Sequence, residues 1–204
     1  MKKKTKNKDL PNFWYRLFKP VLIAIFKLYY HPKFIDKENM KVNDGPIIVA
    51  GNHKHVMDQC GPIACTKRVL HYMAKKEYFD GRHAWFFKMV GCIPVNRSIK
   101  DTDAKEAALH VLEEDGAIGI FPEGTRNKTK EIMLPLKFGV VSMAKKTDAT
   151  IIPFAVTGDY KFRSKNLTYC FGKPFKVTDM ELEEANELLR KTIIELMEKS
   201  KKND

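Results

Sequence analysis

This chain has few cysteines and no spacing typical of a metal site, and these absences exclude two kinds of scaffold. Its four cysteines, Cys60, Cys65, Cys92 and Cys170, form no C-x-x-C pair and no closely spaced framework. A disulfide scaffold or a structural zinc site would need such spacing. We therefore expect reduced cysteines in a protein that faces the cytosol.

The sequence also lacks an apolar run long enough to cross a bilayer. The longest clean run, Val21–Phe26, lies between Pro20 and Lys27, whereas a spanning helix needs about 20 apolar residues. The lysine-rich beginning resembles an export signal, but no small-residue cleavage site follows the apolar run. We expect neither a spanning helix nor an exported protein.

What the chain has in excess is positive charge. Its 204 residues include 37 Lys and Arg against 25 Asp and Glu, a net charge of +12. The 44% hydrophobic and 30% charged content is typical of one folded domain. The charge favours an anionic partner, which could be nucleic acid, an acidic lipid surface, a phosphorylated substrate or an acidic carrier protein. Charge alone does not choose among them.

The N-terminal residues 1–30 combine basic and apolar side chains in a way that suits a membrane surface. Five lysines lie within the first eight residues. Residues 13–30 then carry aromatic and aliphatic side chains, most of them at helical spacing, with Arg16, Lys19 and Lys27 among them. A helix packed on the domain core is the alternative. The lysines favour lipid, because each cation near an anionic leaflet contributes roughly 1 kcal/mol.

The remainder, residues 31–204, alternates short apolar strands with amphipathic helices, which predicts a single α/β domain with a mixed, largely parallel sheet flanked by helices. Apolar periodicity indicates helices through residues 104–112, closed by Gly116, through 138–146, and through 182–197. Thr178 and Glu181 resemble a capping box before the last helix. The expected strands are Pro46–Ala50, Val69–Ala74, Ala117–Phe121, Thr150–Thr157 and Leu167–Phe171.

A first candidate for chemistry follows the strand at Pro46–Ala50. His53 should lie at the strand end, where loops carry sites, and Asp58 is expected to begin a helix. A carboxylate that reaches the imidazole would fix its tautomer and stabilise the imidazolium formed when His53 takes a proton. This is a catalytic triad without its serine, so the substrate itself must supply the hydroxyl.

A second candidate is the string Phe121–Arg126, which also follows a strand. Gly124 allows close approach of the backbone, and Arg126 offers a planar fork for a phosphate. Arg97 ends another short apolar strand, and two arginines at strand ends can bind one phosphate. Either arginine in isolation would more simply form a surface salt bridge.

In this combination and order the sequence resembles the glycerolipid acyltransferases, most closely the lysophosphatidic acid acyltransferases. Four family blocks occur between residues 52 and 154, about half of the chain. The matching positions are Asn52, His53 and Asp58 in the first block, Gly91, Ile93, Val95 and Arg97 in the second, Phe121 to Arg126 in the third, and Ile152, Pro153 and Phe154 in the fourth.

The resemblance implies transfer of a fatty acyl group from a thioester, on coenzyme A or acyl carrier protein, to the sn-2 hydroxyl of lysophosphatidic acid. It assigns the general base to His53 and its orienting partner to Asp58. The acceptor's phosphate would be held by Arg97, Glu123, Gly124, Thr125 and Arg126. No enzyme nucleophile is needed because a thioester is already activated, and no metal or other cofactor is expected.

His55 departs from the family pattern, since many relatives have serine two positions after the histidine. The resulting second imidazole could also claim Asp58, although the resemblance implies that His53 is the base. His-x-His pairs also occur in metallo-hydrolases, but the aspartate here lies three positions beyond His55 and no histidine follows it. That spacing does not suit a metal site.

Two other readings remain open at this stage. The chain could be a nonenzymatic module that binds anionic lipid, or an acyltransferase with another lysolipid acceptor. Nucleic acid is disfavoured because the aromatic residues cluster in the N-terminal segment and are not interleaved with basic ones. We expect a peripheral, monotopic protein on the cytoplasmic face of the cell membrane, with the donor carrier undetermined.

Overall fold

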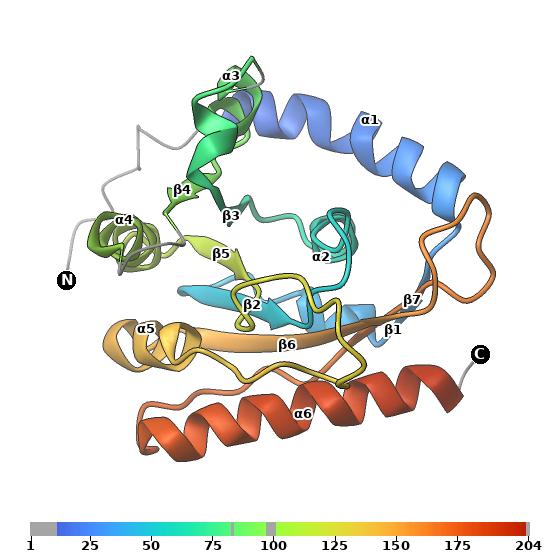
Figure 1. Ribbon diagram of the computed structural model, residues 1–204. Helices are drawn as coiled ribbons and strands as arrows, with labels where there is room; N and C mark the ends of the chain where they lie inside the picture. The colour runs from blue at the N-terminus through green and yellow to red at the C-terminus, as the bar shows by residue number, and fades with distance from the viewer. Residues whose placement is uncertain (1–11, 83, 97–100, 203–204) are drawn as a thin grey trace.

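The computed structural model describes residues 12–82, 84–96 and 101–202, and within them the chain forms one seven-stranded sheet (Figure 1). The strand order is β1-β7-β6-β2-β5-β3-β4. β6 and β7 pair antiparallel, and the other neighbouring strands pair in parallel. The α/β fold with a mixed, largely parallel sheet is therefore confirmed. The strands are β1 (Lys33–Ile35), β2 (Ile47–Gly51), β3 (Leu70–Lys75), β4 (Ile93–Val95), β5 (Ala117–Ile120), β6 (Thr150–Thr157) and β7 (Thr168–Phe171).

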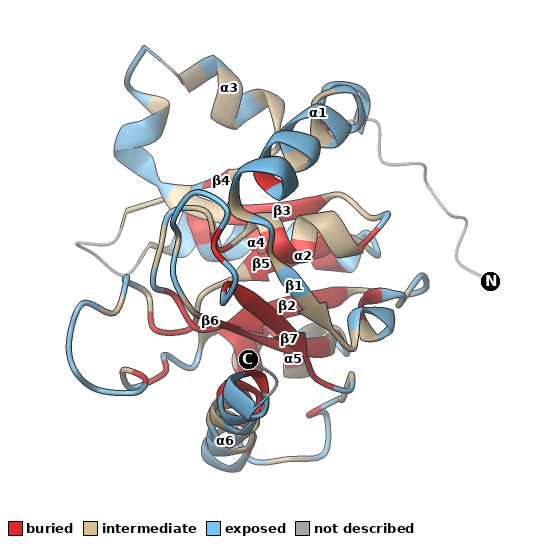
Figure 2. Cartoon of the chain, turned by 90° about the vertical axis from the view of Figure 1, so that its right-hand side faces the viewer, coloured by how far each residue is buried: buried red, intermediate tan, exposed pale blue. Residues whose placement is uncertain are grey.

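Helices cover both faces of this sheet, because its central strands are apolar on both sides. On β2, Ile48 and Ala50 pack with α4 (Thr102–Glu113), α5 (Gly139–Thr147) and α6 (Leu182–Lys202). Ile47 and Val49 point to the opposite face. That face is covered by α1 (Asn12–Tyr30), α2 (Cys60–Cys65) and the 3-10 helix η1 (Lys37–Met40). In Figure 2 the buried strands lie between these two layers.

Two local predictions were wrong at helix ends. The Thr178 hydroxyl donates to Asp148 Oδ1 and does not cap α6. The carbonyl of Glu181 accepts from the amide of Ala185, so α6 begins at Leu182. Asp58 does not begin a helix either, since it lies in the turn before α2. In both cases a side chain that could cap a helix bonds a tertiary or turn partner instead. The sequence also did not reveal β1, η2 (Lys76–Phe79) or α3 (Ala84–Met89).

Helix α1 turns most of its apolar side chains away from the protein (Figure 2). Its buried aromatic residues are Tyr15 and Phe26, and Lys19 points inward to donate to the carbonyl of Thr66. Ile25 and Leu28 are 59% and 72% exposed. A helix that packs on a core shows the opposite orientation. The other large apolar residues exposed on α1 are Phe13, Trp14, Leu17, Val21, Leu22 and Tyr29. None of the helices in the described ranges is both long and apolar enough to span a membrane.

Close packing between β5 and β3 makes Gly119 a sensitive position. A Cβ on Gly119 would lie 2.3 Å from the ring of Tyr72. We expect Gly119→Ala to lower the free energy of unfolding by about 1–3 kcal/mol, because the core would be overpacked. Thermal and urea denaturation measure this.

The matched control is Gly139→Ala at the start of α5, where an added Cβ would meet nothing within 4 Å. It should be neutral or slightly stabilising, because alanine favours the helix. Equal losses of stability in the two variants would contradict the proposed clash.

Candidate active site

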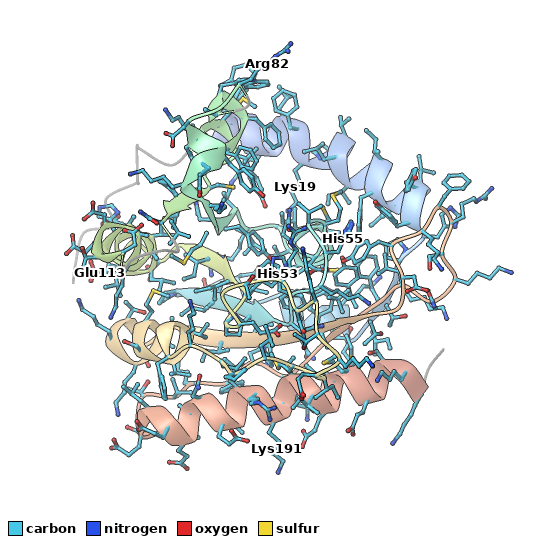
Figure 3. All side chains as sticks on the ribbon, in the orientation of Figure 1. Lys19, His53, His55, Arg82, Glu113 and Lys191 are labelled. Carbon is cyan, nitrogen blue, oxygen red and sulfur yellow. The ribbon has the colours of Figure 1, made fainter. Side chains whose placement is uncertain are left out.

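The site begins where β2 ends, at the carboxyl edge of the sheet. The Asn52 side chain continues the strand pairing, since its amide nitrogen donates to the Val156 carbonyl (3.0 Å) and its oxygen accepts from the Val156 amide (2.7 Å). Asn52 is buried and thereby ties the chain beyond β2 to β6. This contact fixes the backbone from which His53 projects. In Figure 3 the labelled His53 and His55 lie between the sheet and α1.

The two residues of the first block are in contact. His53 Nδ1 and Asp58 Oδ2 are 2.8 Å apart, and both residues are buried. The same carboxylate accepts from the amides of Lys54 (2.7 Å) and His55 (2.8 Å). Its other oxygen accepts from the hydroxyl of Tyr160 (2.6 Å). Because the carboxylate only accepts, Nδ1 carries the proton and Nε2 is left as a hydrogen-bond acceptor.

The second string packs directly on the first. The ring of Phe121 stacks on the imidazole of His53, with centroids 4.0 Å apart. The His53 amide donates to Glu123 Oε1 (2.8 Å), and the Asn127 amide donates to the His53 carbonyl (2.7 Å). The backbone of His53 is therefore held on both sides by the loop that follows β5. Sequence separation concealed this contact, which spans 70 residues.

Glu123 supports the backbone of the site. Its second oxygen accepts from the amide of Leu134 (2.8 Å), so backbone N–H groups engage both ends of a nearly buried carboxylate. Burial raises its pKa, and these two hydrogen bonds oppose the increase. Both carboxylate oxygens of Glu123 are therefore bonded to the backbone of the site, whereas the resemblance implied a contact with the acceptor's phosphate.

The second string becomes more exposed beyond Glu123. Gly124 has φ +72°, a left-handed conformation that glycine adopts without strain and that other residues rarely adopt. Thr125 and Arg126 are exposed on the same loop. Arg97, predicted to bind the acceptor's phosphate as well, lies outside the described residues.

The structure separates the roles of the two histidines. The His55 ring does not bond Asp58; its Nδ1 accepts weakly from the Met57 amide (3.3 Å), and the ring stacks on Tyr160 with centroids 4.1 Å apart. Burial lowers the pKa of His55, while the charge of Asp58 opposes this and that of Arg126 adds to it. Of the two imidazoles, only that of His53 is hydrogen-bonded to Asp58.

A cavity of about 220 Å³ adjoins these residues. Asn52, His53 and Glu123 line it, together with Thr157 and Lys201. It lies between the loop after β5 and the C-terminal end of α6. Over the part of the chain that the structure describes, no three His, Cys, Asp or Glu side chains are grouped closely enough to hold a metal ion.

Comparison with known proteins places this site within a recognised family. The acyltransferase family model matches residues 31–157. The 1-acyl-sn-glycerol-3-phosphate acyltransferase of Bacillus subtilis is 28% identical over 81% of this chain and 84% of its own length. That of Borreliella burgdorferi is 30% identical over 74% of this chain and 66% of its own length.

A solved structure has the same fold. The 1-acyl-sn-glycerophosphate (LPA) acyltransferase of Thermotoga maritima superposes with a TM-score of 0.74 at 19% identity, over 94% of this chain and 79% of that one. The family match covers β1 through β6 and so includes both candidate strings, the Asn52 contact to β6 and the buried Glu123. The chain is therefore an enzyme of the acyltransferase family.

Proposed function

We propose that this acyltransferase moves a fatty acyl group from acyl-CoA or acyl carrier protein to the sn-2 hydroxyl of lysophosphatidic acid, giving phosphatidic acid for phospholipid synthesis. The observation that carries the proposal is the 2.8 Å contact between His53 Nδ1 and a buried carboxylate, which leaves Nε2 as a base. The names of the relatives from Bacillus subtilis and Borreliella burgdorferi support the choice of acceptor.

In this mechanism His53 Nε2 takes the proton of the acceptor hydroxyl as its oxygen attacks the thioester carbonyl. Asp58 holds the imidazole in place and stabilises the imidazolium that forms. The tetrahedral intermediate then expels the thiolate, which receives the proton from His53. One ester bond forms and one thioester bond breaks, so the reaction balances without a metal or other cofactor.

The acceptor's phosphate is proposed to bind at the loop after β5, through Gly124, Thr125, Arg126 and Arg97. Arg126 is exposed and adjoins Asn127, whose amide bonds the His53 carbonyl. A phosphate held there would place its glycerol near the base. Glu123 is not included among these phosphate contacts, because its negative charge would repel a phosphate. Its proposed contribution is to hold the His53 amide.

The membrane surface is proposed to meet α1. The outward apolar face of this helix suits the boundary between headgroups and acyl chains, and the five lysines that precede it in the sequence suit anionic lipid. We propose peripheral association at the cytoplasmic face of the cell membrane. An acceptor lipid could then reach His53 from the side on which α1 lies.

The first prediction distinguishes the two histidines. His53→Ala should lower acyl transfer to lysophosphatidic acid about 10²–10⁴-fold, the typical value for loss of a general base. His55→Ala should cost much less, because its ring does not contact the carboxylate. Mass spectrometry of products, with both thioester donors and a panel of lysolipids, measures this. Equal losses would mean that the base is wrongly assigned, and a preference for another lysolipid would change the acceptor.

A second prediction tests the phosphate site. Arg126→Lys keeps the charge and loses the planar fork, so KM for lysophosphatidic acid should rise about tenfold or more. KM for the thioester donor should change little. The matched control is Lys128→Arg two positions further along the same exposed loop, which should change neither KM. If Arg126→Lys raised KM for the donor alone, the guanidinium would belong to the donor's phosphates.

A third prediction tests the contact of α1 with lipid. Replacing the outward Ile25 and Leu28 by lysine adds positive charge, so electrostatic attraction to anionic vesicles should increase. We nevertheless expect binding to fall about tenfold or more, because each change removes an apolar side chain worth about 1.5–3 kcal/mol on burial. Vesicle sedimentation measures this. Glu198→Lys, at an exposed position of α6, is the control for added positive charge. If the α1 variant bound vesicles as well as the original protein, the membrane contact would lie elsewhere.

A further inference from the structure

Two tyrosines extend the hydrogen bonds of the candidate site beyond the family blocks. Tyr160 follows β6 and donates to Asp58 Oδ1 at 2.6 Å. Tyr169 lies on β7, and its hydroxyl oxygen is 2.6 Å from that of Tyr160. Neither residue lies in the motifs that the sequence analysis singled out. The two side chains connect β7, through Asp58, to the base at the end of β2.

The direction of these hydrogen bonds follows from counting protons. A phenol has one proton, and that of Tyr160 goes to the carboxylate. Tyr169 must therefore donate to the Tyr160 oxygen, with the Met57 carbonyl as a more distant acceptor at 3.3 Å. Burial raises the pKa of both phenols above the usual range, and the charge of Asp58 raises them further. Both groups consequently remain donors throughout the range in which an acyltransferase is assayed.

The rings of these tyrosines are held from several sides. The Tyr160 ring contacts the His55 ring (centroids 4.1 Å apart) and the Tyr30 ring of α1 (5.4 Å). Tyr169 is fully buried, and a Cβ on Gly61 of α2 would lie 2.1 Å from its ring. The hydroxyl positions are thus set by tertiary packing, so the Tyr160 proton reaches Asp58 from a fixed direction.

We propose that Tyr160 is a positioning residue for the acyl transfer reaction, and that Tyr169 holds it in place. The Tyr160 hydroxyl occupies Oδ1 and so leaves Oδ2 facing His53 Nδ1. Without it, one oxygen of a buried carboxylate loses its side-chain donor, and rotation of the carboxylate becomes less costly. This inference rests on the proposed role of His53 as the base.

Removal of this hydroxyl has a definite effect on the titration of the base. A donor on Oδ1 draws charge away from the carboxylate, so its loss leaves Asp58 better able to stabilise a protonated imidazole. Beside His53 lie the titratable groups of Glu123 on the β5 loop and of His55, on which the charge of Arg126 also acts. The charged residues Lys54, Glu131 and Lys201 line the same cavity as His53. Tyr160→Phe changes none of these, so a shift can be attributed to the missing hydrogen bond.

The test compares three tyrosine-to-phenylalanine variants of the full chain. Tyr160→Phe should lower kcat about tenfold, as expected when a charged hydrogen bond is lost. KM for donor and acceptor should stay within about twofold of the original value. The acid limb of the pH–rate profile should move to higher pH. Tyr169→Phe should act in the same direction and more weakly.

Tyr72→Phe is the matched control. Tyr72 is also a buried tyrosine near the site, and its ring stacks on Phe121. Within the described residues its hydroxyl has no hydrogen-bond partner. Its removal should leave kcat and the pH profile unchanged. If Tyr72→Phe had the same effect as Tyr160→Phe, the effect would be a general response to loss of a buried hydroxyl, and the positioning role of Tyr160 would be overturned.

An NMR titration of the imidazoles tests the role of Tyr160 without measuring acyl transfer. The signal of His53 is identified by its absence in His53→Ala, and in Tyr160→Phe it should titrate at higher pH than in the original protein. An unchanged titration would overturn the proposal. If no lysolipid is acylated, the proposed function fails while this measurement still decides the role of Tyr160. If Tyr160→Phe does not fold, the same titration of Tyr169→Phe decides it.

Discussion

One buried carboxylate organises the site. Asp58 is fully buried, and an ionised group in such a place is tolerated only when donors surround it. Four donors do so: the His53 ring, the amides of Lys54 and His55, and the Tyr160 hydroxyl. Three of these donors belong to residues 53–55, in the turn that precedes Asp58. The same carboxylate therefore fixes the conformation of this turn and the orientation of the imidazole. The fourth comes from beyond β6 and joins this loop to the opposite side of the site.

A second nearly buried carboxylate, that of Glu123, has a related task. It joins the amide of His53 to the amide of Leu134, and so ties the end of β2 to the chain beyond β5. The imidazole is therefore positioned from its ring by Asp58 and from its backbone by Glu123. Such rigid support suits general base catalysis, in which small displacements of the base reduce the rate. It also explains why a carboxylate lies in a loop that is proposed to bind phosphate.

Helix α1 relates the site to the outside of the protein. Its apolar residues mostly face outward, while Phe26 packs on Tyr169 and Tyr30 packs on Tyr160. The end of the helix proposed to meet lipid thus contacts the two tyrosines behind Asp58. Contiguous exposed apolar side chains on a protein surface often mark an interaction site. The helix proposed to meet lipid is therefore packed against the hydrogen-bonded groups that hold the proposed base.

Local patterns determined the parts of this protein that depend on neighbouring residues. The pattern of apolar residues predicted the bounds of β2, β3, β5, β6 and β7 to within about one residue. This succeeded because a buried strand needs apolar side chains at its own positions, which local sequence shows. The proposed base and its partner were also found from sequence, since only five positions separate His53 from Asp58. The resemblance of four ordered blocks indicated the family that the comparisons confirm.

Tertiary structure alone decided which distant groups meet. Tyr160 and Asp58 are 102 positions apart, and no local pattern links a lone tyrosine to a carboxylate. The resemblance implied that Glu123 binds the acceptor's phosphate, and only the fold revealed its two backbone partners, His53 and Leu134. Sequence also left undetermined whether the apolar face of α1 points to the core or to the outside. Periodicity defines such a face without showing what it contacts. Sequence specified the groups and their spacing, whereas only the packed sheet determined their partners.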